Sequence, residues 1–486
     1  MALEDIRRER VRKLESYEAA GFDAYPASVR RSFLIAEVLK KFPALARSKK
    51  KVSLVGRVRS WREHGGATFA DLKDASGSIQ LYFSRDELGR DYDSALASVD
   101  IGDFLEATGS LFKTKRGEPT LRVSEWRMVS KSLRPLPEKW HGLKDVEERF
   151  RRRYLDLLMN DGVRERFRMR SKIVKRLREF LDGETFEEVE TPMLQPVAGG
   201  ALAKPFRTHH NALDTDFYLR IAPELYLKRL LVGGYEKVFE IGRNFRNEGI
   251  DATHNPEFTM LELYAAYWSE DEMMAFVEKL FLDLLKAVMR KSAIKYDGKD
   301  IAWKKSFPRI PFVEILKRYA LITDYSETSR EELALKARRF AVEVAAHESK
   351  GKIADEIYKK ICRPHLIQPT FVVNHPIEIS PLAKMGDRKS GEVRRFQLIV
   401  GGLEMVNGFA ELNDPRDQRR RFEEQARERA GGDAEAHAVD EDFIETLEYG
   451  MPSAAGIGIG IDRLVMLLTD TRNIKEAILF PTMRPR

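Results

Sequence analysis

Glycine alternates with isoleucine over residues 456–461, and Asp462 and Arg463 follow directly. Because successive side chains of a strand point to opposite faces, this alternation predicts a strand with one face bare of side chains. A bare face lets another group approach the backbone closely. The apolar run that follows predicts a helix. Simple packing of a helix on a strand is also compatible with the pattern, which meets the spacing of neither a Walker loop nor a dinucleotide fingerprint.

A strand, a polar loop and a second strand are expected upstream of these glycines. Arg246 and Glu248 come at the end of the first strand, and Phe258, Glu262 and Tyr264 occupy even positions along the second. Even positions share one face of a strand. That face offers a ring, a carboxylate and a phenol, with a guanidinium opposite. A hairpin with surface ion pairs, which usually contribute little, is the alternative interpretation.

The first 131 residues predict a helical segment over 1–48 and a small β-barrel over 49–131. A helix is expected between the third and fourth strands, at residues 86–99. Five strands with a helix in that gap are typical of an OB-fold, although other small barrels remain compatible. The strands are expected at residues 52–61, 67–72, 78–83, 104–109 and 119–129.

The remaining chain predicts an α+β domain behind a linker. Residues 132–160 contain two prolines and mixed charges and are interpreted as the linker. The basic run at 149–153 is either a solvated helix start or a phosphate contact. A long amphipathic helix near the start of the domain at 161–486 and a helical insertion at about 327–362 are expected.

Composition narrows the class of protein. A net charge of +7 is weak support for a polyanionic partner. The single cysteine, Cys362, excludes an internal disulfide and favours a reducing compartment. The first residues contain no apolar signal segment, and no apolar run approaches 18 residues, so we expect a cytoplasmic protein without membrane association.

A third segment, from Phe186 through Pro192, predicts a helix end, a strand edge and a proline. In this order the three segments resemble motifs 1, 2 and 3 of the class II aminoacyl-tRNA synthetases. A β-barrel ahead of them resembles subclass IIb, which holds the lysine, aspartate and asparagine enzymes. The similarity to the lysyl-tRNA synthetases extends from about residue 50 to residue 486. It includes residues 144–158, 199–214, 219–230, 379–384, 407–414 and 478–485.

The resemblance implies an antiparallel catalytic sheet flanked by helices, which binds ATP and activates lysine for transfer to tRNA(Lys). It implies that Arg246 contacts the α-phosphate and the lysine carboxylate, where negative charge builds up. Phe258 and Arg463 would sandwich the adenine, and Glu248 and His254 would lie beside the nucleotide. Arg246 and Arg463 are therefore the implied catalytic residues.

The implied lysine site combines carboxylates with hydrogen-bonding groups, which a buried ammonium requires. Glu224 would contact the α-amino group and Glu411 would help to receive the side-chain ammonium. The full implied set is Gly200, Glu224, Arg246, Glu262, Tyr264, Asn407, Phe409 and Glu411.

Magnesium is implied as the partner of ATP, with Glu404 and Gln397 at the family's two metal-ligand positions. The family has glutamate at both, so Gln397 is a departure. An amide oxygen can ligate Mg²⁺ but brings no charge. Weaker metal binding or a changed metal count is one hypothesis, and a tolerated change without consequence is the other.

The barrel is implied to read the tRNA anticodon through Arg62, Phe69, Gln80 and Glu118. Stacking and base-edge hydrogen bonds suit single-stranded loop bases. Without the resemblance, Phe69 would be interpreted as barrel core. The segment with Pro192 is implied to form a homodimer interface, and the short N-terminal segment is closer to bacterial than to animal members.

Three other functions remain to be distinguished. An aspartyl or asparaginyl enzyme disagrees with Glu262, Tyr264 and Glu411, since the aspartate enzymes place an arginine where the acidic side chain binds. A paralogue that modifies an elongation factor would lack the barrel. A non-catalytic RNA-binding paralogue is supported only by Gln397.

Overall fold

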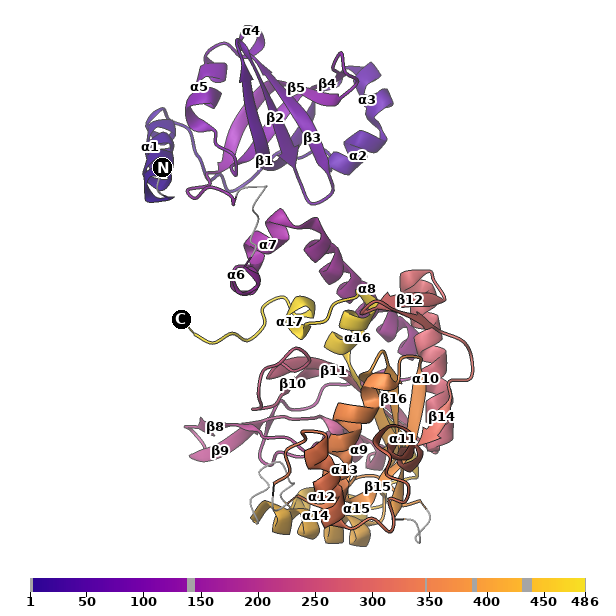
Figure 1. Cartoon of the computed structure of the whole chain (residues 1–486). Helices are drawn as coiled ribbons and strands as arrows, with labels where there is room; N and C mark the ends of the chain where they lie inside the picture. The colour runs from indigo at the N-terminus through magenta and orange to yellow at the C-terminus, as the bar shows by residue number, and fades with distance from the viewer. Residues whose placement is uncertain (1–2, 138–144, 346–347, 387–390, 431–438, 486) are drawn as a thin grey trace. The chain divides into compact units, whose positions relative to one another are not determined.

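The computed structural model describes residues 3–137, 145–345, 348–386, 391–430 and 439–485 (Figure 1). Two compact units divide the chain, Met1–Leu143 and Lys144–Arg486. No helix in the described ranges is long and apolar enough to cross a membrane.

The first unit is a closed five-stranded barrel with helices around it. Neighbouring strands follow the order β1-β2-β3-β5-β4, antiparallel except for the parallel pair β3 and β5. This confirms the OB-fold, and alternate side chains such as Leu72 and Leu81 are fully buried in the barrel. The expected helix at 86–99 is two helices, because Gly89 interrupts it with a φ of 54°. The elements are α1 (Leu3–Ala19), α2 (Ile35–Lys40), α3 (Phe42–Ser48), β1 (Val52–His64), β2 (Ala67–Lys73), β3 (Ser78–Ser84), α4 (Arg85–Leu88), α5 (Arg90–Ser98), β4 (Phe104–Lys113) and β5 (Pro119–Ser130).

The second half of the expected linker is helical and belongs to the second unit. It forms α6 (Val146–Arg151) and α7 (Arg153–Met159), which lead into the long amphipathic α8 (Asp161–Gly183). The basic run at 149–153 is not solvated along its whole length. Its last residue, Arg153, is also not available to a phosphate. Arg153 is fully buried, pairs with Asp156 at 2.7 Å and donates to the carbonyl oxygens of Lys475 and Leu479.

The second unit is built on an eight-stranded sheet in the order β14-β15-β16-β17-β18-β11-β10-β6. Its inner pairs are antiparallel, as expected, and only the edge pairs β14–β15 and β10–β6 are parallel. The three strands that carry the motifs 2 and 3 residues, β10, β11 and β18, are therefore neighbours. The strands are β6 (Glu187–Glu188), β10 (Lys237–Phe245), β11 (Glu257–Ala266), β14 (Arg309–Pro311), β15 (Thr370–Pro376), β16 (Glu392–Val400), β17 (Leu403–Ala410) and β18 (Ala454–Gly460).

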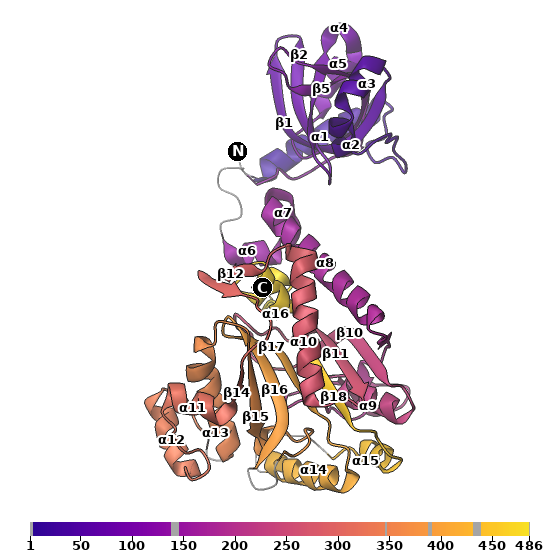
Figure 2. The ribbon, with the colours of Figure 1, turned by 90° about the vertical axis from the view of Figure 1, so that its right-hand side faces the viewer.

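The two faces of β11 have different surroundings. Leu261 and Leu263 belong to a core with α8, α10 (Glu270–Leu284) and α16 (Ile461–Leu468), and α10 runs along this face of the sheet in Figure 2. Tyr264, at an even position, packs instead in a cluster with α9 (Glu224–Val232). The alternation along β11 thus leaves its even positions on the face away from the main core.

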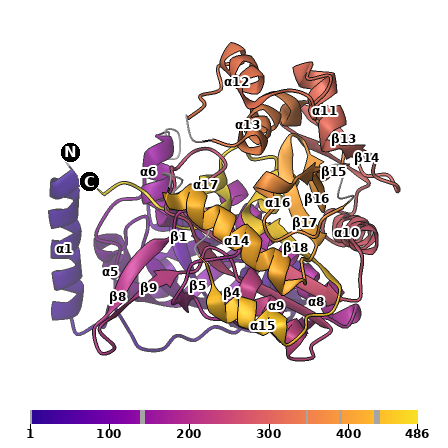
Figure 3. The same cartoon turned by 90° about the horizontal axis from the view of Figure 1, so that it is seen from below.

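Helices at the far end of the sheet complete this unit. In Figure 3, α14 (Pro415–Ala430) lies beside α15 (Glu441–Glu448). Residues 417–440 are rich in Arg, Glu and Ala, a composition that predicts an exposed helix and loop. Gln418, Arg421 and Phe422 are instead buried, because one face of α14 packs against α15 and the Ser380–Ala383 segment. The helical insertion begins earlier than expected, as α11 (Phe312–Ala320), α12 (Arg330–Arg339) and α13 (Lys350–Ile357) form one apolar core.

The remaining elements are β7 (Leu194–Gln195), β8 (Phe206–His210), β9 (Thr215–Leu219), β12 (Ala293–Tyr296), β13 (Lys299–Ala302) and α17 (Ile474–Ala477), with short π and 3₁₀ turns at Leu285–Met289, Tyr358–Cys362, Arg363–His365 and Ile377–Ile379.

Candidate active site

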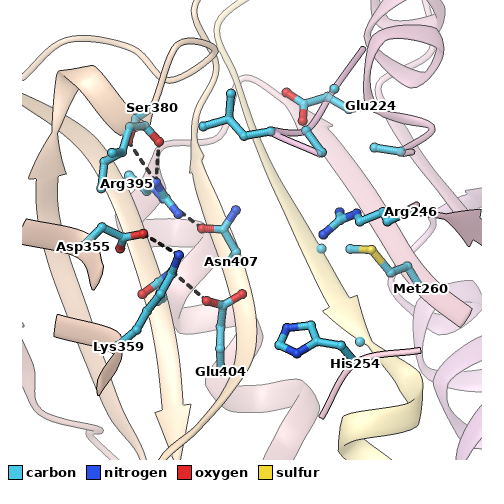
Figure 4. A pocket seen from close by; sticks show the side chains of 18 of the residues that line it. Glu224, Arg246, His254, Met260, Asp355, Lys359, Ser380, Arg395, Glu404 and Asn407 are labelled. Carbon is cyan, nitrogen blue, oxygen red and sulfur yellow. Dashed lines mark hydrogen bonds and ion pairs between the residues drawn. The ribbon is translucent and has the colours of Figure 1, made fainter. Parts of the chain in front are cut away.

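A cavity of about 610 Å³ lies against the central strands of the second unit. In Figure 4, Glu224, Arg246 and Met260 lie across the cavity from Arg395, Asn407 and Glu404. The cavity brings together residues from sequence positions 200 to 474. Of the residues predicted for ATP, lysine and metal, it is lined by Gly200, Glu224, Arg246, Glu248, His254, Phe258, Glu262, Tyr264, Gln397, Glu404, Asn407, Phe409 and Arg463. Glu411 lies behind this wall, fully enclosed by protein.

The glycines of β18 form part of the cavity floor. A Cβ atom on Gly456 would lie 2.3 Å from Tyr264 Cε1, and one on Gly458 would lie 2.6 Å from Met260 Cε. Side chains of the neighbouring strand β11 therefore lie over the bare face. The glycine pattern predicted that some group approaches this backbone closely, and these side chains are that group. The close approach predicted from the glycines is therefore made by strand side chains at the border of the cavity, and not by a helix packed on this face.

Arg246 presents a cation at the end of β10. Its backbone N–H donates to the carbonyl of Pro256 at 2.8 Å, which fixes the loop, and its guanidinium carbon lies 5.1 Å from the centre of the Phe258 ring. Arg246 Nε is buried and has no hydrogen-bond partner among the described residues. A buried donor without a partner is costly, so this position suits an anionic ligand.

Arg463 and His254 face each other across the cavity mouth. Arg463 Nη2 donates to His254 Nε2 at 3.0 Å, and His254 Nδ1 lies 2.8 Å from Asp251 Oδ2. Asp462 holds the start of α16 in place, because its carboxylate accepts from the Thr259 backbone N–H at 2.8 Å. The charge of Asp462 is balanced by Arg170 of α8, 2.5 Å away, a residue that the sequence interpretation did not single out.

Three carboxylates and a phenol gather at the inner end of the cavity. The Tyr264 hydroxyl donates to Glu262 Oε2 at 3.2 Å. Burial, with a contribution from the charge of Glu224, raises the pKa of Glu262 to about 8. Burial also raises the pKa of Glu411 to about 8 against the opposing effect of Lys228. Gly200, with a φ of 87°, allows the chain to approach Glu224, whose Cβ would lie 3.0 Å from a Cβ at residue 200.

The amide of Gln397 is turned with its nitrogen toward Glu404. Gln397 Nε2 donates to Glu404 Oε2 at 2.8 Å, while Gln397 Oε1 accepts from the buried Tyr358 hydroxyl at 3.1 Å. His375 Nε2 lies 3.3 Å from the same Oε1, and burial lowers the pKa of His375 to about 3, so its ring is neutral. Glu404 is thus already hydrogen-bonded by a neutral partner.

These groups fit a magnesium ion held largely by a nucleotide triphosphate. No cluster of three or more His, Cys, Asp or Glu side chains able to hold a metal occurs among the described residues. Glu404 offers one carboxylate, and Gln397 turns an N–H rather than an oxygen toward it. Mg²⁺ commonly binds through one or two carboxylates plus substrate phosphates. A site with two protein carboxylates does not fit this arrangement.

Several cavity residues were missed from the sequence. Arg395 donates to Asn407 Oδ1 at 2.9 Å and to the Ile379 carbonyl at 2.8 Å, and so fixes Asn407. Asp355 and Lys359 pair at 2.8 Å. Their i,i+4 spacing in a helical segment was a usable signal. Arg395 offered none beyond its place two residues before Gln397.

The predicted anticodon residues share the outer surface of the barrel. Thr68 and Ala70 are buried while Phe69 is half-exposed, so Phe69 points away from the core. In the strand register Arg62 faces Phe69, and Phe69 faces Tyr82.

Gln80 lies two residues before Tyr82 on β3 and therefore on the same face, opposite Asp71 in the strand register. Its Oε1 accepts from Thr120 Oγ1 at 3.0 Å, at the start of β5. Glu118 is exposed just before that strand. Tyr82, whose ring centre is 5.1 Å from that of Phe69, was not predicted and prolongs the aromatic surface.

Comparison with known proteins agrees with both halves of this description. The family model for tRNA synthetases class II (D, K and N) matches residues 145–484, and that for the OB-fold nucleic acid binding domain matches residues 52–129. A lysine–tRNA ligase of Carboxydothermus hydrogenoformans is 49% identical over 484 residues, covering 100% of this chain and 99% of the relative. One of Roseiflexus is 48% identical over 488 residues and covers 100% of both chains. The chain therefore belongs to the class II tRNA synthetases and, within them, to the lysine–tRNA ligase family.

Proposed function

We propose that the chain activates lysine with ATP and transfers it to tRNA(Lys). The observation that carries the proposal is the pairing, in one cavity, of a partnerless buried arginine donor with two deeply buried carboxylates, with a third buried carboxylate directly behind the wall. The first group suits phosphate and carboxylate, and the second suits a substrate that carries ammonium groups.

In the first step, a carboxylate oxygen of lysine attacks the α-phosphorus of ATP and pyrophosphate leaves. In the second, the terminal ribose hydroxyl of tRNA attacks the carbonyl carbon of the adenylate, loses its proton, and AMP leaves. Neither step needs a protein nucleophile, so positioning and charge stabilisation supply the catalysis. Arg246 is proposed to stabilise charge at the α-phosphate.

The nucleotide is proposed to lie between Phe258 and Arg463, with Glu248 and His254 beside it. Support comes from the 3.0 Å contact of Arg463 with His254, which holds the guanidinium at the cavity mouth. A magnesium ion bound with ATP would neutralise the phosphates, and Glu404 is the proposed protein carboxylate beside it. Gln397 is proposed to hold Glu404 rather than to bring charge.

Lysine is proposed to bind with its α-amino group at Glu224, near Gly200, and its side chain directed toward Glu262 and Tyr264. Asn407 and Phe409 form the opposite wall, and the charge of Glu411 acts from behind it. Because each carboxylate is buried, an ammonium in the cavity gains strong electrostatic partners.

The barrel is proposed to read the anticodon through Arg62, Phe69, Gln80 and Glu118. A homodimer through the segment at Pro192 is also proposed. Met193 and Leu194, the next two residues, leave 46% and 47% of their surfaces exposed, which supports a partner there. The proposed setting is the cytoplasm.

Lysine-dependent exchange between ATP and pyrophosphate tests the first step. We expect exchange with lysine and not with aspartate, asparagine or ornithine at equal concentration, and charging of tRNA(Lys) when tRNA is added. Exchange without charging would favour a paralogue that modifies another acceptor. No exchange with any amino acid at any Mg²⁺ concentration would refute the proposal and leave a non-catalytic paralogue.

A further inference from the structure

A lysine of the chain itself stands among the carboxylates at the inner end of the cavity. Lys228, on α9, is fully buried, and its Nζ lies 2.6 Å from Glu224 Oε1 and 2.5 Å from Glu411 Oε2. The same Nζ lies 5.3 Å from the centre of the Phe409 ring. Glu224 and Phe409 line the cavity, so this resident ammonium is placed directly behind its wall.

Glu411 is held from one side only. Its Oε1 has no hydrogen-bond partner among the described residues and would lie 2.5 Å from a Cβ atom on Gly456, at the cavity floor. A buried carboxylate with an unsatisfied oxygen is costly unless a further cation or donor reaches it. Lys228 supplies one cation to this carboxylate, at Oε2, and leaves Oε1 as an acceptor for a second donor.

Three carboxylates and four cationic side chains face one another in the cluster, and Lys228 pairs with two of the carboxylates. The cluster is faced by Glu224 and Lys228 from α9 and by Glu262 and Tyr264 from β11. Arg395 faces it from β16, while Arg220, Arg246 and Glu411 follow the ends of β9, β10 and β17. Burial raises the pKa of Glu224 and Glu411, and the charge of Lys228 opposes that rise for both. Burial would lower the pKa of Lys228, but the two carboxylates outweigh it and raise this pKa.

Two buried carboxylates on either side of one point repel each other and take up a proton when no cation separates them. A protonated carboxyl group is a poor partner for an ammonium. We propose that Lys228 is a specificity-determining positioning residue, whose ammonium favours the ionised forms of Glu224 and Glu411 and holds the two carboxylates spaced to receive the ammonium groups of substrate lysine. This inference rests on the proposed function.

The test is the pH dependence of lysine binding, measured by calorimetry from pH 6 to 9 on the full chain. In the parent, affinity should rise with pH through about 8, because Glu262 and Glu411 ionise there. In Lys228→Met the part of the rise that belongs to Glu411 should move upward by at least one pH unit, which corresponds to about a tenfold weaker affinity at pH 7.5. Ionisation of lysine itself is common to all variants and cancels in the comparison.

Two further variants make the result specific. Lys228→Gln also removes the charge but keeps hydrogen-bond donors, so it carries the test if the Met variant does not fold. Lys131→Met is the matched control, since Lys131 is a buried lysine that bridges Asp100 and Asp103 at 2.6 and 2.7 Å in the barrel unit. We expect it to lower the melting temperature and to leave lysine affinity unchanged.

The outcomes separate this inference from the function on which it rests. A parent that binds no lysine refutes the proposed function. A parent that binds lysine, with charge-removed variants that keep its affinity and pH curve, overturns the role of Lys228. Tighter binding by these variants also overturns it, because Lys228 would then compete with the substrate. An upward shift with unchanged KM for ATP supports it.

Discussion

At the scale of single residues, Gln397 determines what a divalent ion meets beside Glu404. Its amide already donates to Glu404 at 2.8 Å, so Gln397→Glu would replace an attractive contact by two adjacent carboxylates. A cation relieves that repulsion, and we expect half-maximal exchange activity at a roughly threefold or more lower Mg²⁺ concentration. Mn²⁺ titration followed by electron paramagnetic resonance, with a non-hydrolysable ATP analogue, should show tighter binding in the variant.

Gln368→Glu is the control for this substitution. Gln368 bonds to the Ala302 backbone N–H and the Asp300 carbonyl, on strand β13. Its replacement should leave the Mg²⁺ curve of the parent unchanged. Superimposable curves for Gln397→Glu and the parent would contradict the role given to the amide.

Arg463 offers a second test at this scale. Arg463→Met removes the guanidinium that donates to His254 and is proposed to cover the adenine. Cation–π attraction of about 0.5–2 kcal/mol corresponds to a roughly 2–30-fold rise in KM for ATP. We expect the KM for lysine to change by less than about twofold, as measured by exchange. An equal rise in both constants would indicate general damage to α16 instead.

At the scale of elements, the glycines of β18 differ in the space that a side chain would have on the bare face. Gly456→Ala would place a Cβ 2.3 Å from Tyr264 and 2.5 Å from Glu411, on a central strand that cannot move freely. At Gly460 the nearest atoms are 3.9 Å away. Overpacking costs about 1–3 kcal/mol. We therefore expect at least about a fivefold higher KM for lysine in Gly456→Ala, and a smaller change in Gly460→Ala.

Steady-state kinetics with lysine as the varied substrate would measure this difference. A thermal melt of each variant separates a displaced Tyr264 from a strand that no longer forms. Equal KM values for the two alanine variants would mean that the glycine face of β18 does not set the lysine pocket.

The barrel strands and the strands around β10, β11 and β18 could be predicted, because alternation of side chains is a local property. The cavity residues that came with a motif were also found. Lys228 was missed although it stands four residues after Glu224 on one helix, and its second partner, Glu411, is 183 residues away and reaches it only in the fold. Arg395 could not be identified, because its contact with Asn407 depends on the pairing of β16 with β17. The buried face of α14 was missed for a related reason, because its covering helix begins only at Glu441.

The prediction for Phe69 shows the same limit of local sequence patterns in the barrel. Alternation identified its strand but left open which face of the strand is inside. The buried neighbours Thr68 and Ala70 decide this question, since they place Phe69 outside. Three-dimensional closure of the barrel supplied what the local pattern could not.

At the scale of the whole molecule, two separate units imply two separable activities. We expect Phe69→Ala to lower charging of tRNA(Lys) by about tenfold or more, given about 1–3 kcal/mol for a stacked base. Exchange with lysine and ATP should be unchanged, because the cavity lies wholly within the second unit. Phe22→Ala, at an exposed ring elsewhere in the first unit, is the matched control. Loss of exchange in Phe69→Ala would show that the units do not work independently.

The burial of Arg153 has a consequence for how the chain is made. Its guanidinium is completed by carbonyl oxygens 322 and 326 residues further along, at Lys475 and Leu479. A ribosome delivers those oxygens long after the arginine has emerged, so the second unit cannot close this contact during most of its synthesis. A product cut short before residue 475 leaves the Arg153 guanidinium with Asp156 but without these two carbonyl acceptors, which destabilises the fold around it. We therefore expect incomplete copies to be cleaved by proteases more readily than the finished protein.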